Sequence, residues 1–209
     1  MRRLAKLGHR QLCQHVTTIE AFPFPVDKDK LCWRLIQEGA GQDPGLQNVL
    51  SEVETDQRSK EWLLDYTNYL SLCQVWGELI AKAHMAVPTV YGLQGESLRG
   101  NTLFDVLKWL IQQGKLIHSG INTKAMTCEE SKPWKNLIFA QLIKAQWWGP
   151  KGEGRWLGPD PTTNPYLNAP VSMLALVTTA VCGMFCGWVS TENSYRLNAS
   201  SLACSLEGR

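Results

Sequence analysis

Histidine and cysteine supply the first candidates for chemistry, because both can bind metal ions. Cys13 and His15 could provide two ligands, and His9 is close by in the sequence. A structural zinc site needs four ligands, usually arranged as closely spaced pairs. His84 and His118 have no partner at such a spacing. We therefore expect these histidines at the surface or at helix ends, and we predict no metal site.

Two stretches resemble catalytic or phosphate-binding motifs only in part. Residues 95–100 (GESLRG) place a serine between glycines, but the second glycine is one residue too late for a nucleophile elbow, and no strand precedes it. Gly152, Gly154 and Gly158 miss the spacing of both phosphate-binding fingerprints. We interpret the first stretch as a turn and the second as linker. No catalytic residue, no cofactor and no enzymatic activity are predicted.

The cysteines are odd in number and dispersed, which is not the pattern of a disulfide framework. They are Cys13, Cys32, Cys73, Cys128, Cys182, Cys186 and Cys204. Cys182 and Cys186 share a helical face, but no histidine, aspartate or further cysteine completes a metal site there. The first four are expected to be free thiols in a reducing compartment. Cys204 differs if it lies across a membrane.

A late apolar segment is the clearest signal in the chain. Residues 171–189 (VSMLALVTTAVCGMFCGWV) carry no charge, and a helix of this length reaches about the 30 Å thickness of the hydrocarbon core of a bilayer. We predict a signal-anchor or transmembrane helix. Gly183, Gly187 and Thr178 would suit a buried helix of a soluble protein equally well. That alternative stays open.

Charged residues on either side of the segment predict its direction. Lys144, Lys151 and Arg155 precede it, whereas only Arg196 follows closely. Cytosolic flanks carry the excess of Lys and Arg. The N-terminal body is therefore predicted to be cytosolic and the C-terminal tail lumenal or extracellular. Asn198, which begins an Asn-Ala-Ser acceptor tripeptide, then lies where N-glycosylation occurs and is the one candidate modification site.

Five stretches of the chain repeat apolar residues at three- and four-residue spacing, as helices do. They are residues 27–38, 46–53, 62–80, 101–111 and 131–145. Pro88 should end the third run, Asn101 should cap the fourth helix, and Ser131 should cap the fifth with Pro133 in its first turn. No alternating strand pattern appears. The expected fold is mainly α, a small bundle of about five helices followed by a Gly/Pro-rich linker and one apolar helix.

Composition sets the expected boundaries. The chain begins basic and amphipathic (MRRLAKLGHRQLCQ) without an apolar signal region, and its prolines force an extended FPFPV connector. Glycine and proline without a period mark the linker. The predicted parts are a basic N-terminal arm and connector (1–26), a helical body (27–148), a linker (149–170), the apolar segment (171–189) and a short polar tail (190–209).

The overall charge limits the classes of partner. The formal net charge is +2, whereas nucleic-acid-binding domains normally combine a pI above about 9 with a clustered basic face. Nucleic acid is therefore not expected as a partner. A membrane and an unidentified protein are the partners that we predict.

Short local stretches resemble retroviral proteins. KPWKNL at residues 132–137, followed by TTNP at 162–165 and MLAL at 173–176, is similar in layout to the long-leader envelope precursors of betaretrovirus-like elements. GRWLGPDP at residues 154–161 is similar to a piece of the betaretroviral integrase C-terminal region. The arginine-rich leader motif of the family is absent, so no RNA-export role carries over. The resemblance implies a non-enzymatic, membrane-associated viral or virus-derived product.

A competing function class explains the same segment without a membrane. A soluble helical adaptor would bury residues 171–189 against Trp62, Trp76 and Trp109. Its remaining tryptophans would then bind a partner protein, since aromatic side chains dominate protein interfaces.

Overall fold

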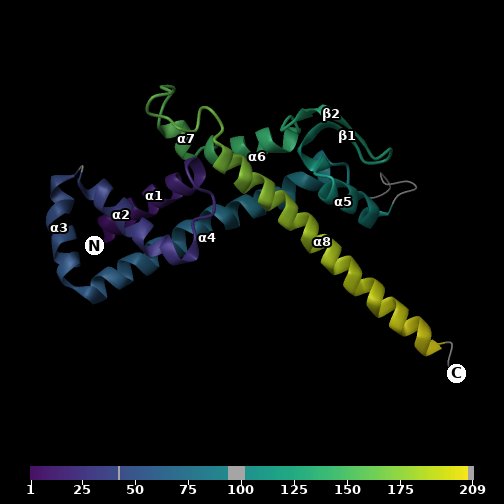
Figure 1. Cartoon of the computed structure of the whole chain (residues 1–209), viewed down its shortest axis with the longest axis horizontal. Helices are drawn as coiled ribbons and strands as arrows, with labels where there is room; N and C mark the ends of the chain where they lie inside the picture. Colours follow the sequence, from purple (N-terminus) through teal and green to yellow (C-terminus); the bar gives the residue numbers. More distant parts are fainter. Residues whose placement is uncertain (42, 94–101, 207–209) are drawn as a thin grey trace. The chain divides into compact units, whose positions relative to one another are not determined.

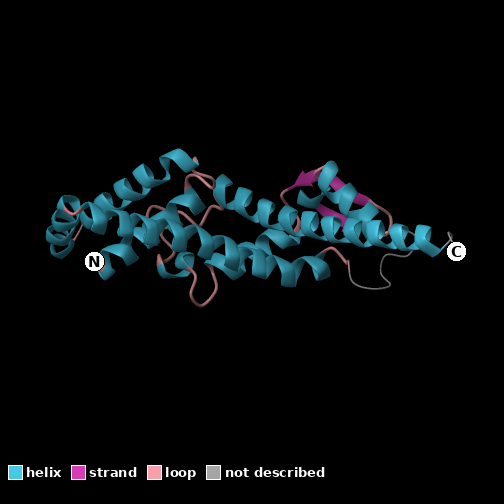
Figure 2. Ribbon diagram, turned by 90° about the horizontal axis from the view of Figure 1, so that it is seen from below, coloured by secondary structure: helices cyan, strands magenta, loops and turns pink. Residues whose placement is uncertain are grey.

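A computed structural model describes residues 1–41, 43–93 and 102–206, and for residues 69–72 and 189–206 it describes the backbone alone. The fold is mainly α, as predicted, with one small hairpin (Figures 1 and 2). The α-helices are α1 (Arg2–Thr18), α2 (Lys28–Gly41), α3 (Pro44–Thr55), α4 (Gln57–Val90), α5 (Leu103–Gln112), α6 (Leu137–Trp147), α7 (Glu153–Trp156) and α8 (Val171–Leu206). The strands are β1 (His118–Asn122) and β2 (Thr127–Pro133), and the 3-10 turns are η1 (Pro25–Asp27) and η3 (Lys115–Ile117).

The chain forms two compact units, and each is built from two separate stretches of sequence. The first unit comprises Met1–Glu78 and Pro150–Leu176, and the second comprises Leu79–Gly149 and Val177–Arg209. The division falls within α4 and within α8. It differs from the single body expected over residues 27–148, because periodicity shows which face of a helix is apolar but not which element covers that face.

The first unit is centred on α1, which we expected to be a basic arm. Leu4, Leu12 and Val16 are buried against Ile36 of α2 and Leu63 of α4 in one apolar cluster. The basic residues of α1 occupy its outer face, so one stretch carries both the charge pattern and a core stripe. The N-terminal segment is therefore a helix of the core, because its apolar face packs against α2 and α4.

A glycine allows α1 to approach its neighbours closely. A Cβ atom added at Gly8 would lie 2.6 Å from Ile36 Cγ1 and 3.3 Å from Thr67 Cγ2. Gly39 of α2 faces Leu7 in the same way, at 2.9 Å from Leu7 Cδ2. The crossing of α1 and α2 therefore depends on the absence of side chains at these two positions.

The third predicted helix runs further than expected. α4 continues past Pro88 to Val90 and ends where Gly92 adopts a φ of +61°. The amide of Leu93 donates to the Pro88 carbonyl at 2.8 Å and closes the last turn. Proline lacks one N–H donor, and near a helix end the following turn can still satisfy the exposed carbonyls.

The hairpin of the second unit was missed. β1 and β2 pair antiparallel with an irregular register, and most of their side chains are at least partly exposed, so no alternation marks them. Ser131 and Pro133 belong to β2, and Asn136 caps α6 instead by accepting from the amide of Ile138 at 3.0 Å. Thr102 is the cap of α5, and Asn101 lies outside the described residues.

A buried hydrogen-bonded group connects four elements of the second unit. The Tyr91 hydroxyl donates to the Leu116 carbonyl at 2.8 Å, and the Asn136 side-chain amide donates to the same oxygen at 3.1 Å. Phe185 of α8 packs edge-on against Tyr91, with ring centroids 5.3 Å apart. The apolar segment therefore contributes to a protein core at this point.

Candidate functional site

The buried side chains of α8, within residues 171–188, lie on one face of the helix. Seven residues at three- and four-residue spacing are almost fully buried. They are Met173, Leu176, Val177, Ala180, Val181, Met184 and Phe185. Burial within the protein thus accounts for these seven residues, whereas Val171 is 83% exposed and Leu174 is half-buried.

The opposite face of α8 is small and polar. Thr179, Gly183, Cys186 and Gly187 are exposed, and a Cβ atom added at either glycine would meet nothing within 4 Å. Residues Val171–Trp188 still have a mean hydropathy of 1.8 over 18 residues, enough in length and composition to cross a membrane. A core helix of a soluble protein meets the same criterion.

Two predicted features fall where the structure gives no side chains. Asn198, the candidate glycosylation site, and Cys204 lie in the part of α8 whose side chains are outside the described residues. Residues 95–100 lie outside the described residues altogether.

Within the described part of the chain, no group of three or more His, Cys, Asp or Glu side chains could hold a metal ion. The Cys13 thiol lies 3.8 Å from His9 Nε2. His15 instead faces Glu20, with 3.9 Å between Nε2 and a carboxylate oxygen. Cys13, Cys32, Cys73, Cys128, Cys182 and Cys186 are free thiols. Burial raises the pKa of the Cys32 thiol to about 12, so it is not a reactive thiolate.

The segment expected to be a linker is instead ordered around one buried asparagine. The side-chain amide of Asn164 donates to the carbonyls of Gly154 at 2.8 Å and Gly158 at 2.6 Å. Its side-chain oxygen accepts from the amide of Tyr166 at 3.0 Å. Asn164 and Tyr166 are buried, so glycine and proline here form a compact loop.

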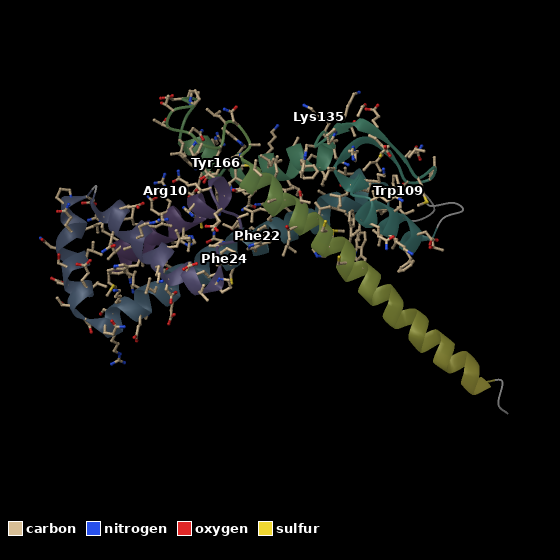
Figure 3. All side chains as sticks on the ribbon, viewed as in Figure 1. Arg10, Phe22, Phe24, Trp109, Lys135 and Tyr166 are labelled. Carbon is tan, nitrogen blue, oxygen red and sulfur yellow. The ribbon has the colours of Figure 1, made fainter. Side chains whose placement is uncertain are left out.

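This loop contacts α1 within the first unit. The Tyr166 hydroxyl donates to Glu153 at 2.6 Å, and Arg10 Nε lies 4.0 Å from the same carboxylate (Figure 3). Burial, followed by the nearby Glu153 charge, raises the pKa of Tyr166 well above its usual range. The tyrosine therefore remains a neutral hydrogen-bond donor that holds the loop.

The connector between α1 and α2 exposes apolar side chains. Ile19 is 69% exposed, Phe24 71% and Val26 83%, and Phe22 is half-exposed. Figure 3 labels Phe22 and Phe24. The ring of Phe22 lies 5.5 Å from that of Trp76. Trp62, which the adaptor hypothesis expected to pack against residues 171–189, is instead half-exposed and stacks on Tyr66 at 5.3 Å. We call Ile19, Phe22, Phe24 and Val26 the connector patch.

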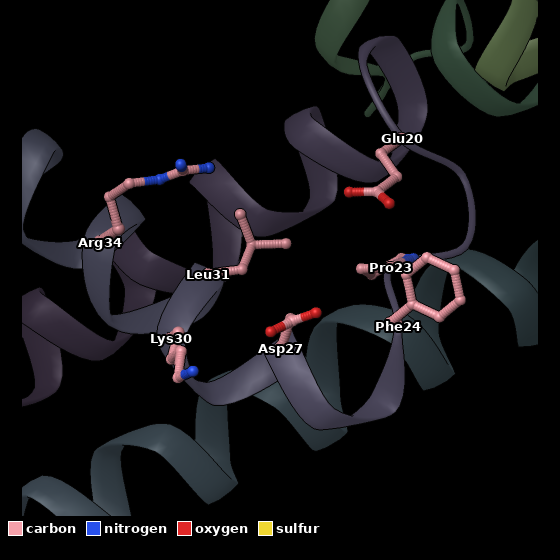
Figure 4. A pocket seen from close by; sticks show the side chains of 7 residues that line it. All are labelled: Glu20, Pro23, Phe24, Asp27, Lys30, Leu31 and Arg34. Atoms are coloured by element: carbon pink, nitrogen blue, oxygen red, sulfur yellow. The ribbon is translucent and has the colours of Figure 1, made fainter.

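A cavity of about 330 Å³ opens beside the connector patch (Figure 4). We call it the connector cavity. Its lining residues are Glu20, Pro23, Phe24, Asp27, Lys30, Leu31 and Arg34. Glu20 and Asp27 present carboxylates to it from two sides, whereas Lys30 and Arg34 lie toward one end (Figure 4). Both signs of charge therefore face one hollow with an apolar floor.

Local structure explains how these charges meet. Pro25 begins η1, which turns the chain from the extended connector into α2. Asp27, Lys30 and Arg34 then follow at three- and four-residue spacing along one helical side. Glu20, just beyond the end of α1, faces them across the turn. The FPFPV connector was predicted, but the cavity that it closes was not.

The His15 ring stands behind Glu20. Burial lowers the pKa of His15, and the Arg34 charge lowers it further. A neutral imidazole does not neutralise Glu20, so the carboxylate can attract a ligand cation.

No curated protein and no solved structure matches the chain. A sequence profile described as "Domain of unknown function (DUF6532)" matches residues 8–200, which extend from within α1 to within α8. Because this match covers most of its length, the chain belongs to the DUF6532 family.

Proposed function

We propose that this chain is a soluble, non-enzymatic helical adaptor that binds a partner protein. The distribution of side chains on α8 is the observation that carries the proposal. Seven apolar side chains of α8, among them Val181 and Phe185, are buried in the protein, whereas Thr179 and Gly183 are exposed. A lone membrane span would expose its whole circumference to lipid, where large apolar side chains rather than a small polar face are favoured.

The partner-binding role rests on the connector patch. Its four large apolar side chains are exposed within eight residues, next to a charged cavity. An exposed apolar patch with a polar rim is typical of protein-binding surfaces.

A membrane-associated product is the second candidate. The mean hydropathy of 1.8 over Val171–Trp188 supports it, and the envelope-leader resemblance would make it a virus-derived protein. In that case the N-terminal body is cytosolic and the tail with Asn198 is lumenal or extracellular.

Two arginine substitutions on α8 separate the candidates. For the adaptor, Thr179→Arg on the exposed face leaves the protein folded, whereas Val181→Arg buries a charge and unfolds it or lowers its stability by several kcal/mol (on the order of 3). For a membrane span, either arginine costs about 2.5–3.5 kcal/mol at the helix centre. Carbonate extraction of expressing cells, with glycosidase treatment, measures localisation, and circular dichroism measures folding.

The adaptor proposal expects an unglycosylated protein in the soluble fraction and a Thr179→Arg variant that melts like the parent. Retention of the parent in the carbonate pellet, with a glycosidase-sensitive mass shift, would reject it and support the membrane candidate.

A further inference from the structure

We infer that the connector cavity binds a short peptide stretch of the partner that carries a basic and an acidic side chain close together. This inference rests on the proposed adaptor function and names the chemistry of its ligand. Its support comes from the volume of the cavity, from the charges that line it and from the connector patch beside it.

The volume suits a few side chains. At about 330 Å³, the cavity is near the lower end of the range of roughly 300–1,000 Å³ typical of pockets for small ligands. A folded domain does not enter such a space, but a pair of side chains on an extended peptide does. Leu31 provides a nearly buried apolar floor for their methylene groups.

The acidic side of the cavity suits a cation. Glu20 and Asp27 both turn carboxylates toward the cavity, and the exposed Phe24 ring stands beside them (Figure 4). A lysine or arginine placed there gains two opposite charges and the face of an aromatic ring. His15 is held neutral by burial and by the Arg34 charge, so it does not compete for this role.

The basic end suits an anion. No described residue pairs with the Asp27 carboxylate or the Lys30 ammonium group, so both charges are available. The ion pair of Arg34 with Glu38, at 3.7 Å, is exposed on both sides. Exposed pairs of this kind contribute little net stability, so a ligand carboxylate can replace Glu38.

The two ends together define the ligand. A ligand with one charge would meet lining charges of opposite sign at only one end of the cavity, whereas a dipolar ligand meets them at both ends. The connector patch continues the surface beyond the cavity, so apolar residues that flank the charged pair in the partner have a place to bind. A peptide, rather than a free metabolite, fits this combination.

Chemical-shift titration of the isotope-labelled full chain tests the inference. The probe is acetyl-Lys-Leu-Glu-amide, and the neutral comparison is acetyl-Gln-Leu-Gln-amide. The dipolar probe should shift amide resonances of residues 20–34 and bind more tightly than the neutral probe. The expected gain is about fivefold for one charge pair and up to about thirtyfold for two, because each exposed pair is worth up to about 1 kcal/mol. Raising the salt to 1 M should weaken binding, since charges are then screened over about 3 Å.

Matched variants show whether the cavity is the site. Glu20→Gln with Asp27→Asn should reduce affinity for the dipolar probe about fivefold or more. Glu52→Gln with Asp65→Asn removes the same charge from exposed positions outside the cavity and should change little. All four residues are exposed, so the folded state should survive in both double variants.

Three results would overturn the inference: no shift with the dipolar probe, equal binding of the neutral probe, or equal loss in the two double variants. Binding of free leucine as tight as that of the blocked peptide would instead assign the cavity to a free amino acid. A negative titration on a soluble chain rejects the peptide site but leaves the adaptor proposal standing. Recovery of the chain in the carbonate pellet rejects the adaptor itself.

Discussion

A single buried imidazole links the core of the first unit to the connector cavity. His15 is almost fully buried near the end of α1, and 3.9 Å separates its Nε2 from Glu20, too long for a good hydrogen bond. Burial and the Arg34 charge therefore prevail over the attraction of Glu20, and the pKa of His15 is lowered. The folded protein favours the neutral ring.

This shift predicts that stability falls in mild acid. A histidine whose folded-state pKa lies below its unfolded value binds fewer protons when folded, so stability declines as the pH falls below about 6.5 toward the folded pKa. Urea denaturation at pH 7.5 and pH 5.0 should show a lower midpoint at pH 5.0. His15→Gln should show a smaller drop over the same interval. An equal drop in both proteins would place the responsible titration elsewhere.

Residue-level prediction succeeded where the chemistry is local. The prolines of FPFPV separate α1 from α2 as predicted, although Pro25 and Val26 belong to the 3-10 turn η1 and are not extended. The isolated cysteines are free thiols in the described part of the chain. The connector cavity depends on Glu20 and Arg34, which η1 and the packing of α2 bring together. No spacing rule in the sequence relates these two residues, because a turn and a helix–helix contact set their distance.

Among the elements, the crossing of α1 and α2 gives a sharp test of packing. Alanine is favoured over glycine by about 1 kcal/mol inside a helix. At Gly8, however, the added methyl group would lie 2.6 Å from Ile36 Cγ1, and overpacking of this kind costs about 1–3 kcal/mol. Gly8→Ala should therefore lower the free energy of unfolding by about 0–2 kcal/mol, the overpacking cost less the gain in helix propensity.

Gly77→Ala is the matched control, because a Cβ atom there meets nothing within 4 Å in the middle of α4. It should stabilise the protein by up to about 1 kcal/mol. Thermal denaturation of both variants measures the difference. A higher midpoint for Gly8→Ala than for Gly77→Ala would contradict the close crossing.

The five helices predicted over residues 27–148 are present, because each has an apolar stripe with a clear period. The hairpin and the loop around Asn164 were not foreseen. Both elements contain side-chain hydrogen bonds: Ser119 donates to Glu129 at 2.8 Å, and the Asn164 amide donates to two backbone carbonyls. Neither element has a periodic apolar pattern. Serine, glutamate and asparagine are common in loops of every kind, so their presence in the sequence does not predict these contacts.

At the scale of the whole molecule, the charge balance predicts a minimum of solubility. The sequence pI is about 8.1, so the net charge is smallest near pH 8 and association is favoured there. Light scattering at constant protein concentration should be greater at pH 8 than at pH 6.5. Scattering that does not change with pH would indicate that the connector patch, rather than net charge, controls association.

Amino-acid composition does not predict the division of the chain into two units. The expected boundary near residue 148 follows a real change to Gly- and Pro-rich sequence, but Pro150–Leu176 belongs with Met1–Glu78 in the structure. Tyr166 and Glu153 make that connection through contacts near α1. A long-range contact between a loop and a helix produces no periodic pattern in the sequence, so it could not be predicted from periodicity.

The interrupted path of the first unit has a consequence for synthesis. Arg10 emerges from the ribosome long before Glu153, its ion-pair partner in the finished protein. At about 5–20 residues per second, the delay is on the order of ten seconds. During that interval α1 lacks the loop that contacts it in the complete fold. The nascent chain is then accessible to proteases and is a substrate for chaperones.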